Sequence, residues 1–328
     1  MPPSKIGSMN RRWWALVACV AWIAAAAAAD FPSKPLKMIV PFPPGGLLDN
    51  VGRALAPSLS AQLGQPVVVE NRPGAAGIIG ADAAVKAAPD GHTLLFSGGV
   101  GFVVAPLLNP GAGFDPLKDL TAVSRVTRGP SVLVAAPSFQ ARSVEELIAL
   151  AKAAPGKLAY GTPGNGNPNH VAGELFKSAA GIDLVHVPYK GAAFVITDVM
   201  AGHIPVGFVT LGAAMPHLRS GRLKALAVTT NARWPAAPEL PTMADAGLPQ
   251  VHLVDWSGFF VPVRTPKAAV ERLSEVVRLS LAAPGLRTRL REQGLEAQGS
   301  TSAELAAELQ SDVARLGRVV KQAGIRTD

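Results

Sequence analysis

Short apolar runs and longer amphipathic runs alternate along the chain after residue 30. The apolar runs of strand length are Leu36–Pro41, Val67–Glu70 and Thr93–Ser97. The runs with helical spacing are 47–63 and 76–88. In the first of these, Val51, Leu55, Leu59 and Leu63 fall on one stripe, and Gly64 follows as a stop signal. This alternation predicts a parallel sheet with helical crossovers.

The same alternation resumes near Gly129 and continues to about residue 250. The predicted strands are Val132–Ala136, Leu158–Tyr160, Leu184–Val187, Ile204–Val209 and Leu223–Thr229. The predicted helices are 144–153, 168–180, 191–201 and 211–219. Ser143 and Glu146 have the spacing of a capping box before the first helix. The Pro- and Ala-rich stretch 231–250 is predicted to run across the surface.

The last part of the chain has helical patterns but too few strands for a sheet of its own. Mixed strand residues occupy Val251–Val263, and Thr265-Pro266 supplies a cap and a first-turn proline for a helix reaching residue 282. A capping box at Thr301 and Glu304 begins a helix to about Ala323. We therefore expect this part to return to the first unit.

The expected organisation is a leader, 1–29, followed by two α/β lobes. Lobe one is discontinuous (30–128 and 251–328), and lobe two is 129–250. The length of 328 residues, with 48% hydrophobic and 16% charged residues, suits two globular lobes and argues against disorder. The formal charge of +8 becomes +5 without the leader, because the leader holds three basic and no acidic residues. Such a charge suits anionic small molecules. Lys and Arg are scattered, which argues against a nucleic-acid partner.

The leader has the pattern of a secretory signal peptide. Arg11 and Arg12 precede the uncharged apolar stretch Trp13–Ala29, which ends in three alanines before Asp30. We expect cleavage after Ala29 and export to the periplasm. A permanent membrane anchor is the alternative, but 17 residues are few for a membrane span.

The single cysteine gives a second alternative for the leader. Cys19 follows Leu16-Val17-Ala18, which resembles a lipoprotein processing box, so lipidation at Cys19 competes with cleavage after Ala29. After cleavage at Ala29 the mature chain has no cysteine. Disulfides, cysteine-ligated metal sites and thiol catalysis are then excluded.

Enzyme motifs are scarce. The sequence has no G-x-S-x-G nucleophile elbow and no complete P-loop. Gly164–Asn169 begins like a dinucleotide-binding motif but lacks its third glycine, so no cofactor is implied. The six histidines show no H-x-H or H-x-x-x-H spacing, and we expect no metal site. An exported hydrolase is the alternative from another class, but Ser97, Ser131 and Ser257 have no base partner that the sequence reveals.

Glycine-rich loops between strands and helices are the most informative feature. They are Pro41–Asp49, Asn71–Gly77, Tyr160–His170 and Val187–Ala193. In the first loop, prolines stiffen the chain and two glycines let the backbone approach a ligand. The free N–H groups of the following helix suit a carboxylate. A plain tight turn with Asp49 in the first helical turn is the alternative. Two loops per lobe fit a cleft at the carboxyl ends of two sheets.

These loops and several other segments resemble the Bug family, the solute-binding proteins linked to tripartite tricarboxylate transporters. The matching segments are Pro41–Gly46 with Asp49, Val69–Gly77, Pro89–Leu95, His170 with Ala172–Phe176, His186–Gly191, Thr197-Asp198 and Pro241–Gly247. The resemblance extends from about residue 31 to the C-terminus. It implies a type II periplasmic-binding-protein fold, with two lobes joined by two crossing strands and a ligand cleft between them. It also implies a monomer that catalyses nothing.

The resemblance also implies a ligand, partners and site residues. The ligand is a small carboxylate held by main-chain N–H groups and waters of the first and third loops, and known family ligands include di- and tricarboxylates, acidic amino acids and nicotinate. The partners are the membrane subunits of a tripartite transporter, or a sensor. The implied site residues are Phe42, Gly46, Asp49 and Gly77 in lobe one, and Thr162, Gly164, Asn165, Asn167, His170, Tyr189 and Gly191 in lobe two.

The chain departs from the family pattern at several of these positions. Leu48 stands where the family has Thr or Ser, and Phe194-Val195 replaces a Pro-Ala pair. Thr162-Pro163 replaces a Ser-Ser pair, and Asn167 replaces a Ser. If Leu48 and Phe194 face the cleft, we expect a monocarboxylate with an apolar part rather than citrate or succinate. The alternative is that both side chains point into the lobe cores.

A ligand-sensing domain without a transport role is a third possibility, since LysR-like regulatory domains share this architecture. The leader and the lack of an N-terminal helix-turn-helix argue against it.

Overall fold

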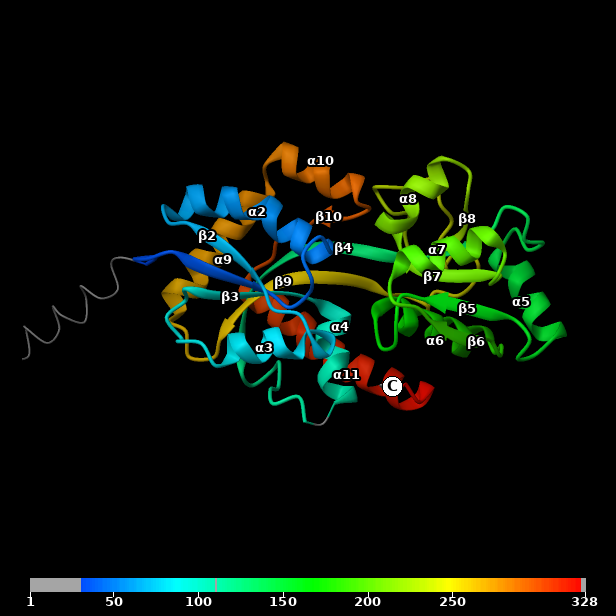
Figure 1. The fold of residues 1–328 in the computed structure, drawn as a ribbon, viewed down its shortest axis with the longest axis horizontal. Coiled ribbons are helices and arrows are strands. Elements are labelled where there is room, and N and C mark those ends of the chain that lie inside the picture. The colour runs from blue at the N-terminus through cyan, green and yellow to red at the C-terminus, as the bar shows by residue number, and fades with distance from the viewer. Residues whose placement is uncertain (1–30, 110, 326–328) are drawn as a thin grey trace, which may run out of the picture.

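The computed structural model describes residues 31–109 and 111–325, so the predicted cleavage site and Cys19 lie outside the described residues. Two α/β lobes lie side by side along the long axis of the molecule (Figure 1). The strand Leu120–Ala135 (β4) runs from one lobe into the other. Its first part pairs with Val254–Pro262 (β9), and its last part pairs with β7 and β8 of the second lobe. This is the expected two-lobe α/β arrangement.

The two lobes contain sheets with the same pattern of strands. In lobe one the order is β2-β1-β3-β9-β4, with β1 parallel to β2 and β3, and β9 antiparallel to β3 and β4. In lobe two the order is β6-β5-β7-β4-β8, with β4 antiparallel to β7 and β8. The remaining strands are β1 (Leu36–Val40), β2 (Val67–Asn71), β3 (Thr93–Gly98), β5 (Ala159–Thr162), β6 (Val185–Pro188), β7 (Val206–Thr210), β8 (Lys224–Val228) and β10 (Glu296–Ala297). The ends of β3 and β7, at Gly98 and Thr210, line one pocket, so these strands end at the side that faces the other lobe.

Helices cover both faces of each sheet. Those of lobe one are α2 (Leu47–Leu63), α3 (Ile78–Val85), α4 (Gly99–Leu108), α9 (Lys267–Leu281), α10 (Pro284–Glu292) and α11 (Ser302–Ala323). Those of lobe two are α5 (Val144–Ala153), α6 (Pro168–Ala180), α7 (Ala192–Ala201) and α8 (Leu211–Arg219). The stripe of α2 packs with α9 on Met38, Phe96 and Phe259. None of the helices in the described residues is long and apolar enough to cross a membrane.

The structure confirms several predicted bounds and corrects others. The helices at 47–63, 168–180 and 211–219 are present as predicted. The prediction that Thr265 caps α9 is wrong. Pro266 is the cap residue, and Thr265 donates its hydroxyl to the Pro262 carbonyl. The box at Ser143 is half formed: Ser143 accepts from the Glu146 N–H, but the Glu146 carboxylate accepts from the Arg142 N–H. The box that begins α11 is complete.

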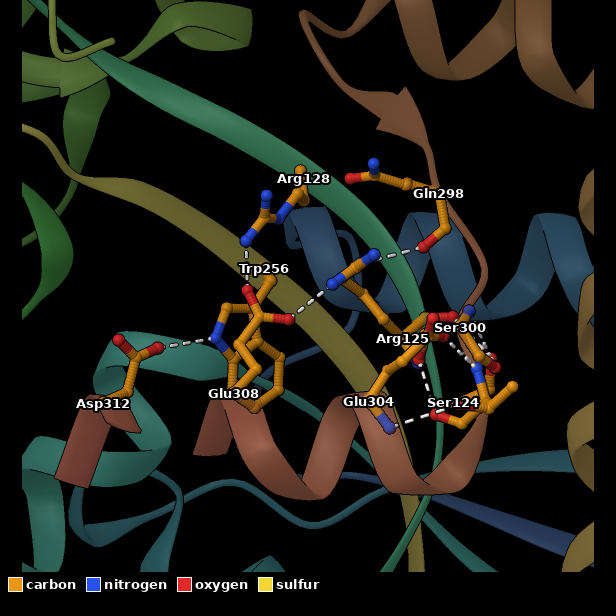
Figure 2. Close-up of polar contacts among 10 residues, drawn as sticks. Ser124, Arg125, Arg128, Trp256, Gln298, Ser300, Glu304, Glu308 and Asp312 are labelled. Carbon is orange, nitrogen blue, oxygen red and sulfur yellow. Dashed lines mark hydrogen bonds and ion pairs between the residues drawn. The ribbon is translucent and has the colours of Figure 1, made fainter. Parts of the chain in front are cut away.

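The C-terminal helix α11 is fastened to both crossing strands (Figure 2). Arg125 and Arg128 of β4 donate to the two oxygens of the Glu308 carboxylate. Trp256 of β9 donates its indole N–H to Asp312 over 2.8 Å. Beyond this contact α11 continues to lobe two, where it packs beside α6. One helix therefore braces the strands that join the lobes.

Candidate functional site

The first loop places the N-terminus of α2 at the cleft. Gly45 has a left-handed backbone, with φ of +81°, and Gly46 is extended, with φ of −71°, and caps the helix. Only Gly45 therefore needs glycine for its conformation. The carbonyl of Gly46 accepts from the Asn50 N–H, which begins the helix.

Asp49 holds the first two loops together. Its buried carboxylate accepts hydrogen bonds from the Gly45 N–H, from Arg53 and from Asn71, each at 2.9 Å. Asn71 also donates to the carbonyl of Phe42. Burial would raise the pKa of Asp49, but these hydrogen bonds outweigh it and hold the pKa below its usual value. With its oxygens occupied in this way, Asp49 shapes the loops.

The second loop lies against the first. Ala75 and Ala76 both have positive φ, and Gly77, with φ of +95°, caps α3. A Cβ on Gly77 would lie 3.5 Å from the ring of Phe42. The predicted residues Phe42 and Gly77 are therefore neighbours. The two alanines in left-handed conformations also explain why α3 begins at residue 78, two residues later than predicted.

Side chains that were predicted to line the cleft form hydrogen bonds within the third loop and to the start of α6. Thr162 is buried, and its hydroxyl donates to the carbonyl of Gly164. Asn167 caps α6, accepting from the N–H groups of Asn169 and His170. Asn165 is half-buried beside them.

His170 lies beneath the same loop. Its Nδ1 accepts a hydrogen bond from the Gly166 N–H at 3.1 Å, and its ring stacks on His186 with 3.8 Å between ring centroids. Burial, with a smaller effect of the Lys177 charge, lowers the pKa of His170 to about 4. The ring is therefore neutral at ordinary pH, as an acceptor at Nδ1 requires.

The fourth loop touches the third. Tyr189 donates its main-chain N–H to the Thr162 carbonyl and its hydroxyl to Asp198 at 2.7 Å. Gly191 caps α7, and Phe194 in the first turn of that helix is 59% exposed. Phe194 does not point into the core of lobe two, so that alternative is wrong for this residue.

A pocket lies where the cleft meets the crossing strands, and we call it the hinge pocket. The empty space there is about 540 Å³, a volume that includes open solvent. Its lining is Leu47, Leu48 and Val51 of α2, Gly98, Thr127, Gly129, Pro130, Thr210–Gly212, Asp255–Ser257 and Gln293–Leu295. Leu48 is thus the one predicted site residue in this lining, and it also packs on the core of lobe one. The other predicted residues are not part of this lining.

Most of this lining was not predicted, and two of its side chains, Asp255 and Gln293, have unusual polar surroundings. Asp255 Oδ1 accepts the Val100 N–H at 2.9 Å and so supplies the acceptor at the start of α4. Burial raises the pKa of Asp255 to about 7; hydrogen bonds from the Val100 and Trp256 N–H groups oppose this, and the Asp312 charge adds to it. Gln293 Oε1 is buried and has no hydrogen-bond partner among the described residues.

Two of the three serines considered as nucleophiles, Ser131 and Ser257, contact neutral groups. Ser131 donates to the side-chain oxygen of Asn169, and Ser257 shares a hydrogen bond with Thr127 at 2.6 Å. Within the described residues, no three His, Cys, Asp or Glu side chains converge as metal ligands.

Comparisons with known proteins agree with this geometry. The model of the "Tripartite tricarboxylate transporter family receptor" matches residues 51–325. Protein BugT of Bordetella pertussis is 36% identical over 308 residues, covering 93% of this chain and 94% of BugT. Among solved structures, R. palustris Rpa4515 with adipate is 34% identical with a TM-score of 0.80, covering 90% of this chain and 99% of that one. MatC from Rhodopseudomonas palustris with bound malate is 30% identical with a TM-score of 0.76, covering 88% and 99%.

Proposed function

This chain belongs to the tripartite tricarboxylate transporter receptor family, and from this premise we propose that it captures a small carboxylate in the periplasm and presents it to membrane subunits or to a sensor. Its fold is the two-lobe type II periplasmic-binding-protein fold with a cleft between the lobes. The family is one of substrate-binding receptors rather than enzymes. The adipate and malate held by the two solved relatives support a carboxylate as the ligand.

The observation that carries the proposal is the set of helix N-termini that follow the glycine-rich loops. Helices α2 and α3 of lobe one, and α6 and α7 of lobe two, each begin directly after one of the four glycine-rich loops. The first N–H groups of α2, α3 and α7 have no side-chain cap, and with the positive end of the helix dipole they favour a carboxylate. In α6 Asn167 already accepts from the Asn169 and His170 N–H groups, so only the dipole acts there. We propose the loop residues implied by the family resemblance, from Phe42 to Gly191, as the surroundings of the ligand carboxylate.

The test is a binding survey by thermal unfolding and calorimetry. The mature chain is mixed with succinate, adipate, malate, citrate, glutamate, nicotinate and benzoate. A binder is stabilised by RT ln(1 + [L]/Kd), and the ligand is recovered unchanged. Stabilisation by none of these carboxylates, or chemical conversion of the ligand, would contradict the proposal.

We also propose export, with removal of residues 1–29. The supporting observation is the A-x-A end of the leader, Ala27–Ala29, after an apolar stretch. The intact mass of protein from the periplasmic fraction should match a chain that begins at Asp30. A lipid-modified chain that begins at Cys19 would contradict this cleavage.

A further inference from the structure

We propose that Asp255 and Gln293 form a specificity subsite in the hinge pocket, which selects a carboxylate ligand whose other end donates a hydrogen bond and rejects one that ends in a second carboxylate. This inference rests on the proposed function, because it concerns the far end of the same ligand. It assigns a role to two side chains that the loops of the cleft do not use.

The position of Asp255 places a carboxyl beside the first loop. A Cβ on Gly98 would lie 3.6 Å from Cδ1 of Leu48 and 3.9 Å from Oδ2 of Asp255. The Leu48 and Asp255 side chains therefore lie on either side of the space above Gly98. Oδ1 is occupied by the Val100 N–H of α4. A ligand whose carboxylate is held near the N-terminus of α2 would extend its other end past Leu48 toward Asp255.

The charge balance of the hinge pocket opposes a dicarboxylate. Among the described residues that line it, Asp255 alone carries an ionisable side chain, and no Lys, Arg or His faces it there. The charge outside the lining that acts on Asp255 is the Asp312 carboxylate of α11, which is also negative. A second ligand carboxylate would meet like charge and the apolar Leu47, Leu48 and Leu211 without a cation.

Among the described residues, the hinge pocket holds one side-chain acceptor without a donor, Gln293 Oε1. Gln293 Oε1 is buried without a partner in the described chain, which is costly unless a ligand or water supplies a hydrogen bond. The main-chain oxygen of Gln293 lies so close to Gly212 of α8 that a Cβ on Gly212 would collide with it. This close packing between the lobes fixes the position of Gln293. Trp234 of lobe two also donates to the neighbouring Gly294 carbonyl at 3.0 Å. At pH 8, above the pKa of Asp255 near 7, a hydroxyl or amine on the ligand can donate to the Asp255 carboxylate and to Gln293 Oε1, whereas a carboxylate cannot.

Three matched pairs of probes test the inference: 4-hydroxybutanoate with succinate, 6-hydroxyhexanoate with adipate, and 4-(hydroxymethyl)benzoate with terephthalate. Each pair keeps one carboxylate and the length, and exchanges only the far group. By calorimetry at pH 8, we expect the hydroxy acid of any pair that binds to bind at least about tenfold tighter than its dicarboxylate.

Two variants show whether the subsite causes the preference. Asp255→Asn keeps an oxygen for the Val100 N–H, so α4 stays capped, and it should reduce the preference about tenfold by relieving the dicarboxylate penalty. Gln293→Met removes the unpaired acceptor and should weaken the hydroxy acid without weakening the dicarboxylate. Thermal unfolding of both variants checks that they fold.

The outcomes separate this inference from the proposed function. If dicarboxylates bind as tightly as hydroxy acids, or if folded Asp255→Asn keeps the full preference, the subsite is refuted while carboxylate capture stands. If no carboxylate of either panel binds, both proposals fall.

Discussion

The indole N–H of Trp256 donates to the carboxylate of Asp312, and this 2.8 Å contact joins the hinge pocket to the helix that braces the lobes. Trp256 lines the pocket beside Asp255, and its ring fills the space that a side chain at Gly99 would need. One turn before Asp312 in α11, the Glu308 carboxylate binds Arg125 and Arg128. Trp256 of the pocket lining and helix α11 are therefore packed together, so a change in α11 should affect both crossing strands.

Removing the charge of Glu308 should weaken this brace. Glu308→Gln leaves two guanidinium groups facing a neutral amide, and we expect a loss of about 1–3 kcal/mol in the free energy of unfolding, less than for a fully buried pair because Arg128 is a third exposed. Urea unfolding measures the loss. Glu271→Gln is the control, because its contact with Lys267 is exposed, and it should change stability by less than about 0.5 kcal/mol. Equal stability of the two variants would show that Glu308 braces nothing.

Asp49 should matter to binding through the loops it joins. Asp49→Ala leaves the Gly45 N–H, Arg53 and Asn71 without their shared acceptor. We expect a loss of about 1–3 kcal/mol in stability and at least about a tenfold loss of affinity for the best carboxylate of the survey. Asp82→Ala, which removes an exposed pair with Lys86, is the matched control and should keep both. Undiminished affinity in Asp49→Ala would show that the loop network does not shape the site.

The sequence predicted the elements whose pattern is local. The stripe of α2 and the capping box of α11 gave the starts of these helices, because amphipathic spacing and caps act over a few residues. Helix α4 was missed because its sequence, GVGFVVAPLL, is apolar on all sides and has no period. Helix α10 was missed because Leu290 is its single buried residue among arginines. Strand β4 was predicted too short because polar residues interrupt its part between the lobes.

The site was predictable to a similar extent. The glycine-rich loops are visible in the sequence, because each needs positive φ or a helix cap at neighbouring positions. Asp255 is one acidic residue in an apolar run, and its partner Val100 is 155 residues away. Its pKa, near 7, arises from burial that tertiary packing creates, and no local pattern reports it.

His170 should make stability fall in weak acid. The folded protein keeps the ring neutral until about pH 4, whereas the unfolded chain takes up the proton near 6.5. A lowered folded pKa therefore gives stability that is complete above pH 6.5 and is lost as the pH falls toward 4, by about 3 kcal/mol at most. His170→Asn keeps an acceptor near Nδ1 and should flatten this part of the profile. His203→Asn, at an exposed position, should not. Urea unfolding between pH 4 and 8 compares the slopes, and parallel profiles for wild type and His170→Asn would refute the assignment.

The two glycines of the first loop should respond differently to a valine. Gly45 has φ of +81°, where a β-branched side chain is strained, so Gly45→Val should lower stability by about 1–3 kcal/mol and disturb the loop. Gly46 has φ of −71° and ψ of 167°, which valine adopts readily, so Gly46→Val should fold with little loss. If the N–H groups at the start of α2 hold the ligand carboxylate, however, the new isopropyl group stands over them and binding is lost. Thermal unfolding with and without the best carboxylate of the survey separates the two effects. A Gly46→Val protein that is stabilised by the ligand as strongly as wild type would remove the first loop from the site.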